Sequence, residues 1–128
     1  MKKTLLASVL PALFVGGVAV AQDDEPQTYT YATYMYCDTD GQERADEIVA
    51  EYDKPVLDKL VEDGEISGWG WLAHHTGGKW RRIRYHQSDS LEGALDGLDA
   101  MNMAMEKAMD DDVAEEFADI CDAHDDYI

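Results

Sequence analysis

The alternation of apolar and polar positions divides residues 29–128 into strands and helices. Residues 29–37, 67–75 and 79–87 are rich in Tyr, Thr, Trp and Ile, which is typical of β-strands. Apolar residues recur at helical spacing over three further segments. The three stripes are Ala45, Ile48, Val49, Tyr52, Val56, Leu60 and Val61; Leu91, Ala94, Leu95, Leu98, Met101 and Met105; and Val113, Phe117, Ile120, Cys121 and His124. A very short last strand is expected near residues 126–128.

Residues with special backbone preferences mark the ends of these elements. Asp40 and Glu43 have the spacing of a capping box and predict the start of the first helix. Pro55 is expected to kink or split that helix, and Gly64 to end it. Gly77–Gly78 suits a two-residue hairpin turn between the second and third strands.

The order β-α-β-β-α, followed by a helix or a short strand, predicts an α+β domain. It resembles the ferredoxin-like unit, in which helices cover one face of an antiparallel sheet. More narrowly, the chain resembles the dimeric α/β-barrel superfamily, which includes the antibiotic-biosynthesis monooxygenases and the NIPSNAP-like proteins. The resemblance spans roughly residues 28–105 and rests on the helix that leads through Gly64 into SGWGWLAHHTGGKWRRIRYHQSDSLEGAL. It implies a homodimer without cofactors, and the weak fourth strand is a departure from the pattern.

The first residues have the pattern of a secretory signal peptide. Lys2 and Lys3 precede an apolar run that ends in Ala19-Val20-Ala21, so cleavage is expected after Ala21. The alternative is an uncleaved membrane anchor, although the run is short and Pro11 interrupts it. We therefore expect a signal peptide at 1–21, a flexible acidic lead at 22–28 and a single domain at 29–128. The protein would be periplasmic or secreted, with no membrane span after cleavage.

The charge is strongly negative. The whole chain carries −18 and residues 1–21 contain two lysines and no acids, so the cleaved chain carries −20. This balance disfavours nucleic acid as a partner, because such binding needs a wide basic surface. It fits either adaptation to high salt, which screens self-repulsion, or a plain solvated acidic surface.

The two cysteines, Cys37 and Cys121, favour a disulfide in an exported chain. In the chain-entropy model, closing so long a loop contributes about 4 kcal/mol. The alternative is a metal site that uses Cys121 and His124, but a single C-x-x-H pair with no second pair is weak support. We therefore expect no metal.

Basic residues are concentrated in KWRRIR at 79–84, although the protein is acidic. A turn at Gly77–Gly78 pairs residues whose numbers add to 155, which places one set of side chains on a common face. This set is Trp69, Trp71, His75, Trp80, Arg82, Arg84 and His86. The opposite face carries Leu72, Ile83 and Tyr85 and is expected to pack under the helices.

Tryptophan and arginine side chains together suit a ligand pocket, because apolar walls with a few aimed polar groups are typical of such sites. Arginine grips carboxylates, and it also lies well over indole rings. The resemblance implies that this Trp/Arg/His face lines the cavity. A subunit interface or a solvated face remains an alternative.

Two functions follow from this face. The first is a non-catalytic module that binds a small anionic or aromatic molecule or a partner through Trp69, Trp71, Trp80, Arg82 and Arg84. The second is a cofactor-independent monooxygenase- or isomerase-like enzyme, in which His86 or His75 transfers the proton. The absence of a recognisable catalytic motif favours the first.

Overall fold

The computed structural model describes residues 26–128, so the expected signal peptide and most of the acidic lead lie outside the described residues. The elements in chain order are β1 (Tyr29–Tyr36), η1 (Thr39–Gly41), α1 (Gln42–Ile48), η2 (Val49–Asp53), α2 (Lys54–Glu62), β2 (Gly68–Ala73), β3 (Arg82–Ser88), α3 (Leu91–Ala108), α4 (Asp111–Ile120) and β4 (Ala123–Tyr127). Among residues 26–128, no helix is both long and apolar enough to cross a membrane.

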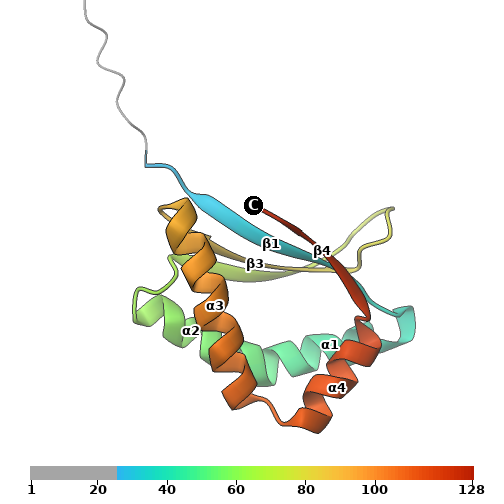
Figure 1. The fold of residues 1–128 in the computed structure, drawn as a ribbon. Coiled ribbons are helices and arrows are strands. Elements are labelled where there is room, and N and C mark those ends of the chain that lie inside the picture. The colour runs from blue at the N-terminus through green and yellow to red at the C-terminus, as the bar shows by residue number, and fades with distance from the viewer. Residues whose placement is uncertain (1–25) are drawn as a thin grey trace, which may run out of the picture.

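The four strands form one antiparallel sheet in the order β2-β3-β1-β4. All four helices lie on the same side of this sheet, and its other side is open (Figure 1). The predicted α+β class and the ferredoxin-like arrangement are therefore confirmed. We call the two sides the covered face and the open face.

The fourth strand is longer and begins earlier than the sequence pattern predicts. β4 pairs with β1 from Tyr36 opposite Ala123 to Ala32 opposite Tyr127. His124, which the periodicity assigned to the third helix, therefore lies in β4. The helical stripe ends at Cys121 because the chain there leaves α4 and turns back along β1.

The register of the β2–β3 hairpin is confirmed over the paired residues. Trp69 lies opposite His86, and Trp71 lies opposite Arg84. Gly77 and Gly78 both have positive φ, as the predicted turn requires. The ladder ends at Ala73 and Arg82, so the tip of the hairpin is a loop in which strict alternation no longer holds.

Pro55 divides the first helical segment, as expected, but through a widened turn. Pro55 has no N–H to donate to the preceding turn, and the backbone before it forms the π-helical turn η2. The N–H of Lys54 bonds to the carbonyl of Val49, five residues back. The expected capping box at Asp40 is not formed: α1 begins after Gly41 without a side-chain cap.

The core lies between the covered face and α2 and α3. Leu57, Ile66 and Met101 form its centre, with Trp69 packed against them. α3 begins at Ser90, whose hydroxyl accepts a hydrogen bond from the N–H of Gly93 and caps the helix. Gly64 has positive φ and follows α2, as predicted.

The expected orientation of the sheet is wrong. The side that carries Arg82 and His86 packs under the helices, and these residues are 7% and 1% exposed. Leu72 is 48% exposed, because it lies on the open face with Ile83 and Tyr85. The charged side chains of the covered face find carboxylate partners on the helices, and these pairs offset the cost of burying charge.

The predicted disulfide between Cys37 and Cys121 is present. It joins the residue after β1 to the residue after α4, and the N–H of Asp38 bonds to the carbonyl of Ile120 beside it. None of the residues of α4 is fully buried. The disulfide therefore ties the C-terminal end of α4 to the end of β1, and the Arg44–Glu116 ion pair ties α4 to α1. Because disulfides persist in oxidising compartments, this bond is consistent with an exported protein.

Candidate functional site

The two arginines of the covered face have different surroundings. Arg82 binds both carboxylate oxygens of Asp46, with Nε–Oδ1 at 2.6 Å and Nη2–Oδ2 at 2.7 Å, and its Nη1 donates to Gln42. Trp71 donates its indole N–H to the same Asp46 carboxylate at 2.7 Å. The Arg82 guanidinium holds the pKa of Asp46 below its usual range. Arg82 is thus fully engaged with α1 and has a structural role.

Arg84 is mostly but not fully buried, with a side chain 13% exposed, and it is incompletely paired. Its Nη1 donates to Oδ2 of Asp53 at 3.0 Å and contacts the sulfur of Met105 at 3.4 Å. Its Nε is buried and has no hydrogen-bond partner among the described residues. A buried N–H without a partner is costly, so such a group marks a position where a ligand or water oxygen can bind.

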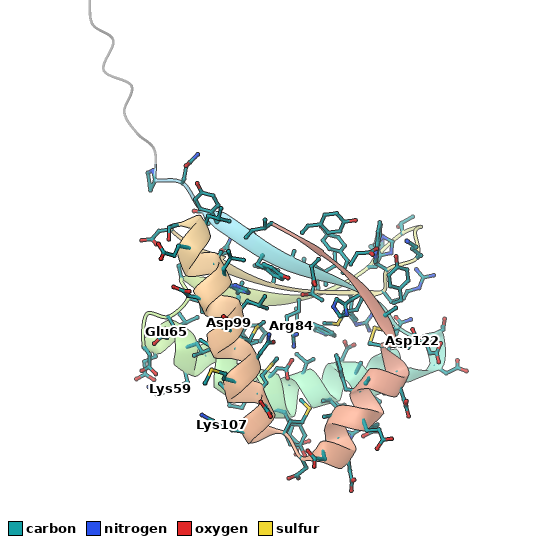
Figure 2. All side chains as sticks on the ribbon, viewed as in Figure 1. Lys59, Glu65, Arg84, Asp99, Lys107 and Asp122 are labelled. Carbon is teal, nitrogen blue, oxygen red and sulfur yellow. A yellow bond between two sulfur atoms is a disulfide. The ribbon has the colours of Figure 1, made fainter. Side chains whose placement is uncertain are left out.

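Two cavities meet at Arg84, which lies between the sheet and the helices (Figure 2). The first, which we call the Asp53 cavity, has a volume of about 310 Å³, and the second, the Tyr31 cavity, about 390 Å³. Both are lined by Arg84, Asn102 and Phe117, which we together call the Arg84 site.

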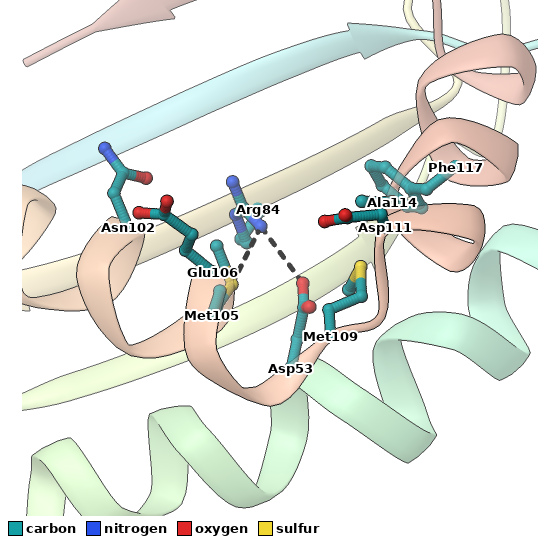
Figure 3. A pocket seen from close by; sticks show the side chains of 9 residues that line it. All are labelled: Asp53, Arg84, Asn102, Met105, Glu106, Met109, Asp111, Ala114 and Phe117. Atoms are coloured by element: carbon teal, nitrogen blue, oxygen red, sulfur yellow. Dashed lines mark hydrogen bonds and ion pairs between the residues drawn. The ribbon is translucent and has the colours of Figure 1, made fainter.

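The walls of the two cavities differ. In the Asp53 cavity, Asn102, Met105 and Glu106 come from α3, and Asp111, Ala114 and Phe117 come from α4 (Figure 3). The Tyr31 cavity adds Tyr31 and Thr33 from β1, together with His124 and Asp126 from β4. Each cavity combines an apolar wall with a few polar groups, which is typical of small-ligand sites.

Asp53 is the last residue of the π-helical turn η2 and is 2% exposed. Burial raises the pKa of Asp53 above its ordinary value, and the neighbouring Arg84 offsets only part of that rise. π-helical turns are frequent at functional sites, and so are buried carboxyl groups with perturbed pKa values. Asp53 is therefore the carboxyl group best placed to act at the Arg84 site.

His86 is held inside the fold instead of lining either cavity. Its Nε2 donates to the carbonyl of Ala94 at 2.7 Å, and its ring stacks on Tyr31. Burial lowers the pKa of His86, which favours the neutral ring. The geometry gives His86 a contact with α3 and leaves its expected proton-transfer role without access to a ligand.

The expected grouping of the three tryptophans is only partly present. Trp69 and Trp71 lie on the covered face, where Trp69 donates to Asp58 and Trp71 packs at 6.3 Å from the ring of Phe117. Trp80 lies on the open side instead, against Tyr34 at 5.5 Å. The hairpin ladder ends before Trp80, so strand alternation does not control its direction.

His75 is exposed in the hairpin tip and is not brought together with His86. Cys121 and His124, the alternative metal pair, cannot bind a metal together, because the sulfur of Cys121 is in the disulfide. Within residues 26–128 there is no group of three or more His, Cys, Asp or Glu residues placed to hold a metal ion.

Sequence reasoning missed Asp53, Asn102 and Phe117 as site residues. A signal for Asp53 is present, because it falls midway between Val49 and Leu57 at intervals of four on an otherwise apolar helix stripe. An acid in such a position needs a buried partner. Asn102 and Phe117 carry no comparable signal, because only the packing of α3 and α4 brings them to Arg84.

The comparisons with known proteins concern the fold. No protein-family model and no curated protein matches the sequence. A NIPSNAP family protein from Agrobacterium tumefaciens superposes with a TM-score of 0.60 and 8% identity, over 80% of this chain and 84% of that one. A dimeric protein of unknown function with a ferredoxin-like fold, from Bacteroides fragilis, superposes with a TM-score of 0.53 and 11% identity, over 78% of this chain and 92% of that one. The chain thus has a ferredoxin-like fold similar to that of a NIPSNAP family protein.

Proposed function

We propose that the protein is a small-molecule-binding module whose ligand occupies the Arg84 site. The observation that carries the proposal is the buried Nε of Arg84, which lacks a partner where two cavities meet. An oxygen of the ligand accepts a hydrogen bond from the guanidinium of Arg84, which lines both cavities. The apolar wall contributed by Phe117 and Met105 suits an aromatic or aliphatic body.

Tryptophan fluorescence tests this proposal, because Trp71 lies opposite Arg84 and packs against Phe117. Titration of residues 22–128 with a panel of aromatic carboxylates and amides is expected to give saturable quenching. Arg84→Gln should remove the response. Trp80→Phe, on the open side, should leave it unchanged. A panel that never quenches, or quenching that survives Arg84→Gln, contradicts the proposal.

The alternative of a cofactor-independent enzyme has less support. Its expected acid–base groups were His86 and His75, and neither lines the cavities at Arg84. The buried carboxyl group of Asp53 is the only observation that favours proton transfer there. We therefore place ligand binding first.

We also propose that the protein is exported and forms a homodimer through the open face. Thr30, Ala32, Tyr34, Leu72, Ile83, Tyr85 and Gln87 line a shallow hollow on this face. Leu72 is exposed and the other six are partly exposed, and such a surface of mostly apolar and aromatic groups is typical of an interface. The dimeric state of the ferredoxin-like protein from Bacteroides fragilis supports this proposal.

Two matched leucines test the dimer. Leu72 on the open face and Leu95 on α3 are 48% and 49% exposed. Leu72→Glu is expected to shift the mass measured by light scattering from dimer to monomer, whereas Leu95→Glu should leave a dimer. A monomeric wild type, or a Leu72→Glu variant that stays dimeric, contradicts the proposed interface.

A further inference from the structure

Asp53 and Arg84 present two different hydrogen-bonding groups to the same cavity. Arg84 offers only N–H donors, and ionised Asp53 offers only acceptors. Their mutual bond uses Nη1 of Arg84 and Oδ2 of Asp53, while Nε of Arg84 stays unpartnered. A ligand group that enters the Asp53 cavity and bonds to Arg84 therefore also meets a carboxyl group.

The charge of this cavity is unfavourable for an anion. The charged groups that line it are Arg84 from β3, Asp53 from η2, Glu106 from α3 and Asp111 from α4 (Figure 3). Glu106 and Asp111 are exposed and screened by solvent, whereas Asp53 is almost fully buried. Repulsion between two carboxylates is strongest where water is excluded. Asp53 therefore contributes most of the free-energy cost of binding a ligand carboxylate in this cavity.

We propose that Asp53 and Arg84 form a specificity pair: a carboxamide binds beside ionised Asp53, whereas a carboxylate binds only together with one proton held by Asp53. The proposal rests on the proposed function, because it assumes that the ligand bonds to Arg84. The amide oxygen accepts from Arg84 and the amide N–H donates to Asp53. A carboxylate has no such N–H, so the carboxyl group of Asp53 must supply the hydrogen.

Burial already moves Asp53 toward the protonated form, since its pKa is raised in the free protein. A bound carboxylate raises this pKa further, because it places a like charge nearby. Carboxylate binding is therefore linked to proton uptake, and its affinity falls as the pH rises above the pKa of free Asp53. The pH dependence of carboxamide binding has the opposite sign. Its affinity falls only as the pH is lowered and Asp53 becomes protonated.

Benzoate and benzamide are suitable probes, because they have the same shape and differ only in the polar group. Calorimetric titrations between pH 5.5 and 8 should show that benzoate affinity falls about tenfold per pH unit once Asp53 is ionised in the free protein. Benzamide affinity should change less than about twofold over the same upper range. Repeating the benzoate titration in buffers of different ionisation enthalpy should reveal about one proton taken up per benzoate.

Asp53→Asn provides the decisive variant, because asparagine keeps the shape and carries an amide N–H without a charge. Benzoate should then bind without pH dependence or proton uptake, and more tightly than to wild type at pH 8. Asp58→Asn makes the same chemical change on exposed α2 and should behave like wild type. Circular dichroism checks that each variant folds. If Asp53→Asn does not fold, ¹³C NMR of the wild-type aspartate carboxyl groups gives the same test, since benzoate should raise the titration midpoint of Asp53.

The outcomes separate the two proposals. Benzoate that binds through Arg84 without a pH slope or proton uptake overturns the specificity pair and leaves the proposed function standing. A slope that disappears in Glu106→Gln/Asp111→Asn but persists in Asp53→Asn also overturns it. If neither probe binds wild type or Asp53→Asn at any pH, the proposed function fails as well.

Discussion

The covered and open faces of one sheet use opposite chemistry. The covered face buries charge: Arg82 and Arg84 lie under the helices and pair with Asp46 and Asp53. The open face exposes apolar and aromatic side chains, such as Leu72. This is the reverse of the simplest rule for a two-layer domain, in which the apolar face packs under the helices. The reversal fits the two proposed roles, in which the covered face binds a small ligand and the open face binds a second copy.

The largest effect is expected from the disulfide, which holds α4 over the covered face. Cys37→Ala/Cys121→Ala should lower the free energy of unfolding by about 4 kcal/mol. It should also weaken ligand binding at the Arg84 site, because α4 supplies Phe117 to both cavities. Urea unfolding with and without reductant measures the first effect. Reductant should destabilise wild type and leave the double variant unchanged, and an equal response of both would contradict the prediction.

Two aspartates offer the next comparison. Asp46 and Asp58 each accept a hydrogen bond from an indole N–H and each form an ion pair. The cation is buried Arg82 for Asp46 and exposed Lys54 for Asp58. Asp46→Asn should cost about 1.5 kcal/mol, because it leaves the buried guanidinium of Arg82 without its counter-charge, while solvent at the half-exposed Asp46 position screens part of the loss. Asp58→Asn should cost much less, because its ion pair with Lys54 is exposed and screened by solvent. Thermal unfolding at pH 7 measures both, and equal losses would show that burial of Arg82 does not matter.

The stability that the Asp46–Arg82 ion pair contributes depends on pH, and the pKa of Asp46 determines in which direction. The pKa of Asp46 is lowered mainly by its hydrogen bonds with Arg82. The stabilisation is therefore present at neutral pH and is lost as the pH falls through the lowered pKa of the folded state. Wild type and Asp46→Asn should consequently approach each other in stability toward acidic pH, and a constant gap in melting temperature would argue against this linkage.

Smaller effects on stability are expected from alanine substitutions at two glycines, one beside the covered face and one on the open face. A Cβ at Gly97 would lie 2.7 Å from a methyl group of buried Ile66 and 3.3 Å from the ring of His86. Overpacking there should outweigh the gain in helix propensity, so Gly97→Ala is expected to lose about 1 kcal/mol. A Cβ at Gly70 meets only the outer end of the Tyr85 ring, which can swing away on the open face. Gly70→Ala should change stability by less than about 0.5 kcal/mol, and a larger loss than for Gly97→Ala in urea unfolding would contradict the comparison.

The sequence was sufficient for most of the fold. Gly77–Gly78 determines the hairpin register, Pro55 marks the division of the first helix, and the two cysteines pair as expected. The orientation of the sheet was not predictable from its own alternation. It depends on which helix acids reach Arg82 and Arg84, and the chain has 28 Asp and Glu residues from which to choose.

The candidate site was predictable only in its centre. Arg84 stands out because basic residues are rare and clustered, and Trp71 follows from the hairpin register. Asp53 reaches the same cavity from the end of the π-helical turn η2, and Phe117 reaches it from α4, which the disulfide and the Arg44–Glu116 ion pair hold in place. Trp80 was misplaced because the ladder ends before it.

A single ¹H–¹⁵N correlation spectrum during a benzoate titration at pH 6 tests the central claim most directly. The four arginine Nε–H signals and three indole signals report on both faces at once. We expect the Nε–H of Arg84 and the indole of Trp71 to shift with a common saturation curve, while the indole of Trp80 stays in place. A shift of Trp80 with Arg84 unchanged would show instead that ligands bind the open face.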